Sequence, residues 1–159
     1  MTVKMSKIST VGVVGAGQMG NGIAHVCALA GYDVLLSDAD AGRIDNAQIP
    51  ALYAAADVML NPSTVDNMPI SILEAFASGV PVVSTDVGGV PFIAEDGRTA
   101  LLVPARDPAQ MAGAMLRILQ DRPLAVRLAA AARDEVKQYA WPVVRQKWLA
   151  VYRRLARNR

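Results

Sequence analysis

The feature that most limits how this chain can fold is a glycine-rich turn between a predicted strand and a predicted helix. Residues 10–15 are apolar and mostly β-branched, and they lead directly into the sequence Gly-Ala-Gly-Gln-Met-Gly at residues 15–20. Glycines at these positions permit a tight turn, the close approach of a phosphate to the backbone and close packing of the helix on the strand. The N-terminus of that helix offers N–H groups to an anion. The pattern therefore predicts an α/β domain with a nucleotide-compatible turn.

An acidic residue, Asp38, ends the next predicted strand, Asp33–Asp38. A carboxylate at this place would accept hydrogen bonds from an adenosine ribose and would repel a 2′-phosphate, which favours NAD over NADP. No cofactor is required by the residues that we find, and the NAD binding that we expect is weak. The predicted cofactor-binding residues are Gly15, Gly17, Gln18, Met19, Gly20 and Asp38.

The first part of the chain, about residues 7–45, resembles the NAD-binding start of the 3-hydroxyacyl-CoA dehydrogenase family. The resemblance depends on Met19 after the variable position, on the run Gly22-Ile23-Ala24 and on the sequence Leu-Leu-Ser-Asp-Ala-Asp at residues 35–40. The catalytic histidine of that family, its glutamate partner and its helical substrate domain have no match here.

A second pattern occupies residues 49–157. Its blocks are Ile49–Asp57, Asn61–Ser63, the acid-x7-Glu motif from Asp66 to Glu74, Ser78–Val83, Asp86–Pro91 and Gly97–Val103. In this order the blocks resemble the C-terminal nucleotide-binding domain of GT-B glycosyltransferases of the family 4 type.

That resemblance implies a sugar-nucleotide site. Glu74 would bind the ribose, and Asp66 would face the sugar together with the backbone N–H groups of Asn67, Met68 and Ile70. Asp66 stands where the family more usually has glutamate, and the family's Arg/Lys pair, expected before Ile49, has no match. Glu74 has an alternative role, because a carboxylate one turn into a helix gains stability from the helix dipole.

Strands and helices alternate with short connections, which predicts a three-layer, Rossmann-like or flavodoxin-like α/β domain. We expect a five-stranded parallel sheet in the order 2-1-3-4-5, because right-handed crossovers and one helical connection place the third strand beside the first. A different Rossmann order would need a further strand between Asp38 and Asp57. The predicted strands are residues 10–15, 33–38, 58–60, 81–84 and 100–103, and the predicted helices are residues 18–30, 41–56, 69–78, 108–120, 124–137 and 142–157.

The two resemblances together predict a single chimeric domain, residues 1–159, in which a dehydrogenase-like piece (1–45) is joined to a glycosyltransferase-like piece (46–159). We expect an engineered or recombined scaffold that keeps some nucleotide affinity, is not an enzyme and has no catalytic residue. Two alternatives stay open. One is an NAD-binding module or dehydrogenase fragment, and the other is the sugar-nucleotide-binding half of a GT-B glycosyltransferase.

Composition limits the partners. The formal net charge of +2 is too small to indicate nucleic acid, and one cysteine excludes an internal disulfide and a cysteine-rich metal site. No apolar run is long enough for a membrane span, and residues 1–7 lack the apolar core of a signal peptide. We therefore expect a cytoplasmic protein without metal, nucleic-acid or membrane partners.

The last predicted helix, Pro142–Arg157, combines an apolar stripe with a basic face. The stripe either packs on its own domain near Ala28 and Leu29 or forms a homodimer, so that the protein is either a monomer or a dimer through this helix. A basic amphipathic helix also suits a membrane surface, but the family resemblance does not favour that role. The stripe consists of Trp141, Val144, Trp148, Val151, Tyr152 and Leu155.

Overall fold

The computed structural model describes residues 10–14, 23, 33–37 and 49–157. The predicted cofactor residues Gly15, Gly17, Gln18, Met19, Gly20 and Asp38, and most of the predicted helix 18–30, lie outside the described residues. Within them the elements alternate between strands and helices, as the sequence pattern predicts.

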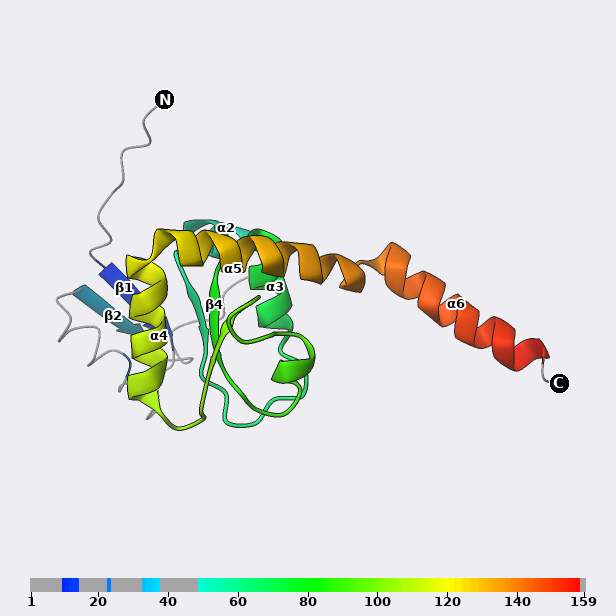
Figure 1. Ribbon diagram of the computed structural model, residues 1–159, viewed down its shortest axis with the longest axis horizontal. Helices are drawn as coiled ribbons and strands as arrows, with labels where there is room; N and C mark the ends of the chain where they lie inside the picture. Colours follow the sequence, from blue (N-terminus) through cyan, green and yellow to red (C-terminus); the bar gives the residue numbers. More distant parts are fainter. Residues whose placement is uncertain (1–9, 15–22, 24–32, 38–48, 158–159) are drawn as a thin grey trace, which may run out of the picture.

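The described strands form two parallel sheets (Figure 1). In the first, β1 (Thr10–Val14) pairs with β2 (Asp33–Ser37). In the second, β4 (Val82–Thr85) lies between β3 (Met59–Asn61) and β5 (Leu101–Val103).

The predicted five-stranded sheet in the order 2-1-3-4-5 is therefore wrong. The pairings within each sheet agree with that order, but no described pairing joins β1 to β3. The physical reason is that apolar runs identify strands locally, whereas the neighbour of a strand depends on contacts between distant residues. The prediction for β1 and β3 came only from general topological preferences.

Local signals set the ends of the helices. Gly79 adopts a left-handed conformation with φ 75° after α3, and its N–H donates to the carbonyls of Ala75 and Phe76, which ends the helix. Asp107 caps α4 by accepting from the Gln110 N–H, and Asp121 caps α5 by accepting from the Leu124 N–H. The helical segments are α2 (Ile49–Ala55), α3 (Ile70–Ser78), η2 (Val90–Phe92), α4 (Pro108–Gln120), α5 (Arg122–Glu135), η3 (Val136–Tyr139) and α6 (Trp141–Arg157).

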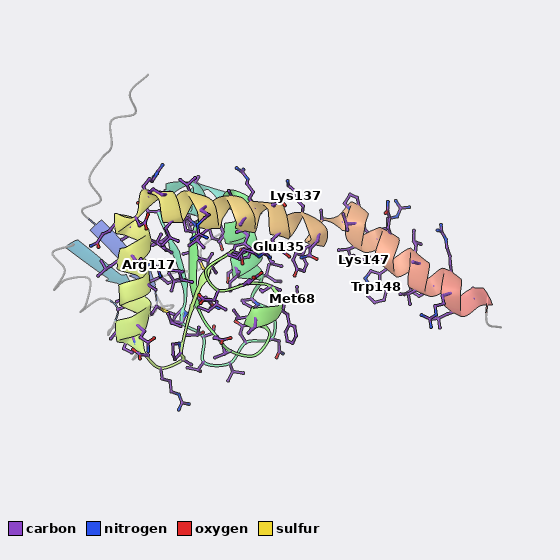
Figure 2. All side chains as sticks on the ribbon, in the orientation of Figure 1. Met68, Arg117, Glu135, Lys137, Lys147 and Trp148 are labelled. Carbon is purple, nitrogen blue, oxygen red and sulfur yellow. The ribbon has the colours of Figure 1, made fainter. Side chains whose placement is uncertain are left out.

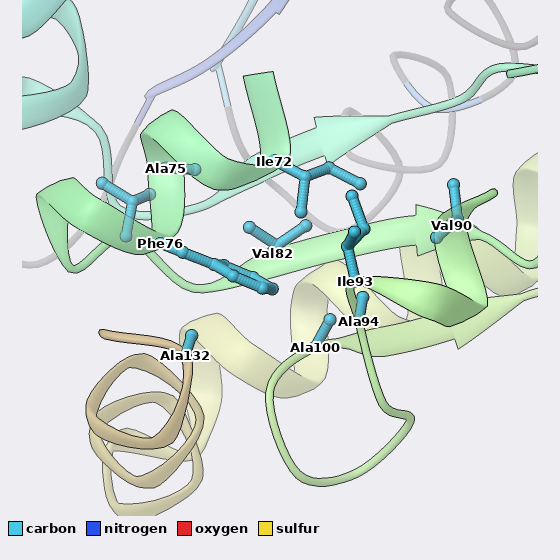
Figure 3. Close-up of a cluster of buried hydrophobic side chains, with 10 residues drawn as sticks. Ile72, Ala75, Phe76, Val82, Val90, Ile93, Ala94, Ala100 and Ala132 are labelled. Carbon is cyan, nitrogen blue, oxygen red and sulfur yellow. The ribbon is translucent and has the colours of Figure 1, made fainter. Parts of the chain in front are cut away.

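Two apolar clusters cover opposite faces of the β3-β4-β5 sheet. Val83 of β4 belongs to the cluster under α4 and α5, whereas its neighbour Val82 belongs to the cluster under α3. Successive side chains of a strand point to opposite faces, so this sheet is packed on both sides. Figure 3 shows Phe76 and Ile72 of α3 beside Val82. This arrangement confirms the predicted Rossmann-like α/β layers for this part of the chain.

One expected packing place of helix α6, near Ala28 and Leu29, lies outside the described residues. The helix itself is described to Arg157. It extends away from the sheets beyond η3 (Figure 1), after Ala140 adopts an extended backbone that separates the two helical segments. Trp148 is 55% exposed and Tyr152 is 61% exposed. None of the described helices has the length and apolar character that a membrane crossing needs.

We expect Phe76→Ala to reduce the free energy of unfolding by about 3–5 kcal/mol, because the fully buried ring leaves a cavity between α3 and β4. The matched control is Phe92→Ala, since Phe92 is 86% exposed and its loss should change stability by no more than about 0.5 kcal/mol. Denaturant unfolding of both variants measures the difference. Equal effects would contradict the described core.

Candidate functional site

The loops that follow β3 and β4 meet at one edge of the three-stranded sheet. Since the strands are parallel, their carboxyl ends lie at the same edge, and Asn61 at the end of β3 is paired with Ser84 of β4. The Asn61 Nδ2 donates to the Ser84 Oγ at 3.1 Å. Open parallel sheets bind ligands beyond the carboxyl ends of their strands, so this edge is the place to look for a site.

A short chain of polar contacts holds Asp66 at this edge. The Ser63 Oγ lies 2.8 Å from the Asn61 Oδ1 and 3.2 Å from the Asp66 Oδ2. One hydroxyl proton is therefore shared between an amide oxygen and a carboxylate oxygen. Asn61 is buried and Asp66 is half-buried, so the loss of these partners would leave polar groups without compensation.

The Thr85 side chain of β4 also holds the loop after β3 in place. Its side chain is fully buried, and its Oγ1 donates to the Ser63 carbonyl at 2.5 Å and lies 3.4 Å from the Asn61 carbonyl. The loop after β3 is thus tied by its backbone to the end of β4. This arrangement limits how far Asp66 can move.

Gly88 and Gly89 allow the loop after β4 to pack closely against the loop that carries Asp66. The Gly89 N–H donates to the Asp66 carbonyl at 2.9 Å. A Cβ at Gly89 would lie 1.4 Å from the Asn67 carbonyl oxygen, and one at Gly88 would lie 2.0 Å from the Asp66 carbonyl oxygen. No side chain larger than hydrogen fits at either position without a backbone shift.

The beginning of α3 has no side-chain cap. Its N-cap residue is Pro69, which makes no capping hydrogen bond, whereas α4 and α5 are capped by Asp107 and Asp121. The N-cap residue therefore leaves first-turn N–H groups and the positive end of the helix dipole without a side-chain cap. The predicted residues Asn67, Met68 and Ile70 flank this point and are all exposed.

Glu74 lies one turn further along α3 and is held by a tyrosine from another helix. The Tyr53 hydroxyl of α2 lies 3.1 Å from the Glu74 Oε2 and 3.1 Å from the Ser71 carbonyl. Burial and then the hydrogen bond to Glu74 raise the pKa of Tyr53 to about 12. The tyrosine thus stays a neutral donor at physiological pH and orients one oxygen of the carboxylate.

The structure brings Asp66, Asn67, Met68, Ile70 and Glu74 onto one loop and the helix that follows it. The anchoring roles of Tyr53, Ser63 and Thr85 were missed by the sequence analysis. Tyr53 and Ser63 fall in the blocks of the glycosyltransferase-like pattern, which was the available signal for them.

The described residues were also searched for a metal site and for pockets away from Asp66 and Glu74. No cluster of three or more His, Cys, Asp or Glu side chains that could hold a metal ion occurs among them. A shallow pocket of about 280 Å³ lies between β5 and α4, and its lining includes Asp96, Gln110 and Arg117 but none of the predicted site residues.

Comparison with known proteins finds one family along most of the chain. The family described as "Glycosyl transferases group 1" matches residues 11–121. D-inositol 3-phosphate glycosyltransferase of Corynebacterium diphtheriae is 35% identical over 105 residues, which cover 66% of this chain and 25% of that protein. The Streptomyces avermitilis protein of the same name is 32% identical over 146 residues, which cover 89% of this chain and 31% of that protein.

A solved structure gives the same result. Sucrose-phosphate synthase from Thermosynechococcus elongatus superposes with a TM-score of 0.70 at 26% identity, covering 94% of this chain and 39% of that chain. This chain therefore spans about a quarter to two-fifths of the length of these proteins.

These matches correct two expectations. The expectation that the chain is not an enzyme is contradicted, because the relatives at 35% and 32% identity are glycosyltransferases. The predicted chimera of a dehydrogenase and a glycosyltransferase is not supported. One family matches from residue 11 onward and one relative aligns over 89% of the chain, so nothing indicates a join near residue 45 or engineering. The glycine-rich sequence and the residues around it misled the prediction, because glycine patterns of this kind occur in many nucleotide-binding families.

We expect Gly89→Ala to destabilise the fold by about 1–3 kcal/mol, because the new methyl group would displace the backbone at Asn67. Gly113→Ala in α4 is the control, since its Cβ meets nothing within 4 Å. Alanine there should stabilise the helix by about 0.5–1 kcal/mol. Thermal unfolding of the two variants should shift the midpoint in opposite directions, and a shift of the same sign would contradict the close contact of the two loops.

We expect Tyr53→Phe to lower the free energy of unfolding by about 0.5–1.5 kcal/mol at neutral pH, because a hydroxyl with two acceptors is lost. The raised pKa means that the fold favours the neutral phenol. This stabilisation is complete below the ordinary pKa of 10.0 and is lost as the pH rises toward about 12. Unfolding of wild type and variant across this range should therefore converge, and a constant difference would show that the hydroxyl has no such role.

Proposed function

Because this chain belongs to the group 1 glycosyltransferase family, we propose that it forms the part of a glycosyltransferase that binds the sugar nucleotide. The observation that carries this proposal is the uncapped beginning of α3, placed between two acidic residues that other side chains hold in position. The loops after β3 and β4 supply the walls of the site.

Each part of the arrangement has a chemical role toward such a ligand. The N-terminus of α3 supplies N–H donors and a partial positive charge for a diphosphate. The Glu74 carboxylate, with one oxygen held by Tyr53, can accept hydrogen bonds from the two hydroxyls of a ribose. The Asp66 carboxylate can accept hydrogen bonds from the hydroxyls of a sugar.

Sugar transfer breaks the bond between the sugar and the diphosphate, so negative charge builds up on the leaving group. Donors that already point at that charge stabilise the transition state more than the ground state. In this proposal the first turn of α3 has that role, and the buried network below it keeps the turn in place. Asn61, Ser63 and Thr85 act by positioning the loop and do not touch the ligand.

The glycine-rich turn adds a second ligand to be tested. Gly15, Gly17, Gln18, Met19, Gly20 and Asp38 predict weak NAD binding with a Kd near or above ~0.1 mM. NAD therefore serves as the competing nucleotide in the experiment that follows.

The test is calorimetric titration of the chain with UDP-glucose, GDP-mannose and NAD. We expect one of the two sugar nucleotides to bind more tightly than NAD. Glu74→Gln should weaken that binding by about tenfold, because a charged acceptor of ribose hydrogen bonds is lost. The control is Asp57→Asn, which makes the same charge change just before β3, at the opposite end of the strand from the site.

The outcomes separate the proposals. Sugar-nucleotide binding that Glu74→Gln weakens and Asp57→Asn leaves unchanged supports the donor site. Binding of NAD alone, or sugar-nucleotide binding that both variants leave unchanged, contradicts it. Release of the sugar from the donor, measured with the wild-type chain and with Glu74→Gln, links the same residue to the reaction.

A further inference from the structure

One side chain of α2 controls the direction of a carboxylate that the proposed donor site uses. The Tyr53 hydroxyl lies 3.1 Å from the Glu74 Oε2 and 3.1 Å from the Ser71 carbonyl. A hydroxyl has one proton, so these two oxygens compete for it. The Ser71 carbonyl lies inside α3, where a helical N–H already bonds to it, and a carboxylate is the stronger acceptor. The tyrosine proton is therefore directed mainly to Glu74.

Packing holds the Tyr53 hydroxyl in its place. The Tyr53 ring is half-buried and packs against the apolar cluster under α3, which includes Ile72 and Phe76. Glu74 is exposed, so its carboxylate without a partner would rotate among several positions. Burial raises the pKa of Tyr53 to about 12, so the hydroxyl keeps its proton at neutral pH. The tyrosine thus supplies the order that the Glu74 side chain lacks.

The direction of the Glu74 carboxylate matters for a ribose because of the number of hydrogen bonds involved. The two oxygens of a carboxylate offer about four lone-pair positions, and Tyr53 uses one of them on Oε2. The remaining positions suffice for the neighbouring 2′ and 3′ hydroxyls of a ribose, provided that both oxygens face them. A 2′-deoxyribose lacks one of these donors. Sites that hydrogen-bond a hydroxyl reject the analogue without it, because a polar group is then left unpaired.

We propose that Tyr53 is a positioning residue that makes the donor site select ribonucleoside diphosphates over their 2′-deoxy counterparts. The proposal rests on the proposed function, because it needs Glu74 to meet the ribose. Tyr53 does not touch the ligand and acts through Glu74. By holding the carboxylate before the nucleotide arrives, it removes the ordering cost that binding would otherwise include.

The test is calorimetric titration of the full chain with UDP beside dUDP and with GDP beside dGDP. The members of each pair differ only in the 2′ hydroxyl. We expect the wild type to bind the ribonucleotide of one pair roughly tenfold more tightly than the deoxynucleotide. Tyr53→Phe keeps the ring and should reduce this preference to roughly threefold, whereas Glu74→Ala should remove it.

A double-mutant cycle distinguishes positioning from a general loss of stability. In the Glu74→Ala background, Tyr53→Phe should change the affinity for the ribonucleotide by less than about twofold, because no carboxylate remains for the hydroxyl to hold. A tyrosine that only stabilises the fold would cause the same loss of affinity in both backgrounds.

Tyr139→Phe is the matched control. The Tyr139 hydroxyl lies 3.5 Å from the Phe92 carbonyl, so this change also removes a hydroxyl from a partly buried tyrosine. Tyr139 belongs to η3, and Figure 2 shows Lys137 of the same segment at a separate place on the body from Met68 in the loop before α3. The control should leave the preference for the ribonucleotide unchanged.

The outcomes separate this inference from the proposed function. Glu74→Ala can remove the preference while Tyr53→Phe leaves it unchanged, which would overturn the role of Tyr53 and leave the donor site standing. Equal losses from Tyr53→Phe in both backgrounds, or an equal loss in Tyr139→Phe, would have the same meaning. Absence of nucleotide binding, or binding that Glu74→Ala leaves unchanged, would overturn both proposals.

Discussion

The contact between the two loops at the carboxyl edge of the sheet holds the candidate site together. The Gly89 N–H donates to the Asp66 carbonyl, and the Thr85 hydroxyl donates to the Ser63 carbonyl. Both bonds end on backbone oxygens of the loop after β3, so the path of that loop is determined by β4 and the turn that follows it. Without this contact the loop that carries Asp66 would lose two of the hydrogen bonds that hold it against β4 and the turn after it.

A difference in capping separates structural helices from the one that we assign to ligand binding. The N-termini of α4 and α5 are satisfied by Asp107 and Asp121, so their dipoles are compensated within the protein. The N-terminus of α3 has no such cap, and the nearby Asp66 is held by Ser63 instead. The fold leaves the α3 N-terminus without a protein cap at the edge where parallel sheets bind ligands, which suits an anionic group.

Two aromatic residues, Phe76 and Trp148, show how burial decides the role of a side chain. Phe76 is an apolar side chain that finds a complete enclosure between α3, β4 and neighbouring segments, so it stabilises the domain. Trp148 is also a large aromatic side chain, but it lies on helix α6, which extends away from the domain after Ala140, and it is 55% exposed. Burial, and not side-chain type, decides whether an aromatic residue stabilises the fold.

The sequence by itself determined the local elements. Gly79, Pro108 and the apolar runs of β4 and β5 placed helix ends and strands within a residue or two, because these signals act between near neighbours. The predicted helix 69–78 also placed Glu74 on a helix, with Asp66 in the loop before it. Only the tertiary structure decided that the strands form two sheets and that Tyr53 holds Glu74. Each of these depends on contacts between residues far apart in the chain, and no local pattern carries the energy of such contacts.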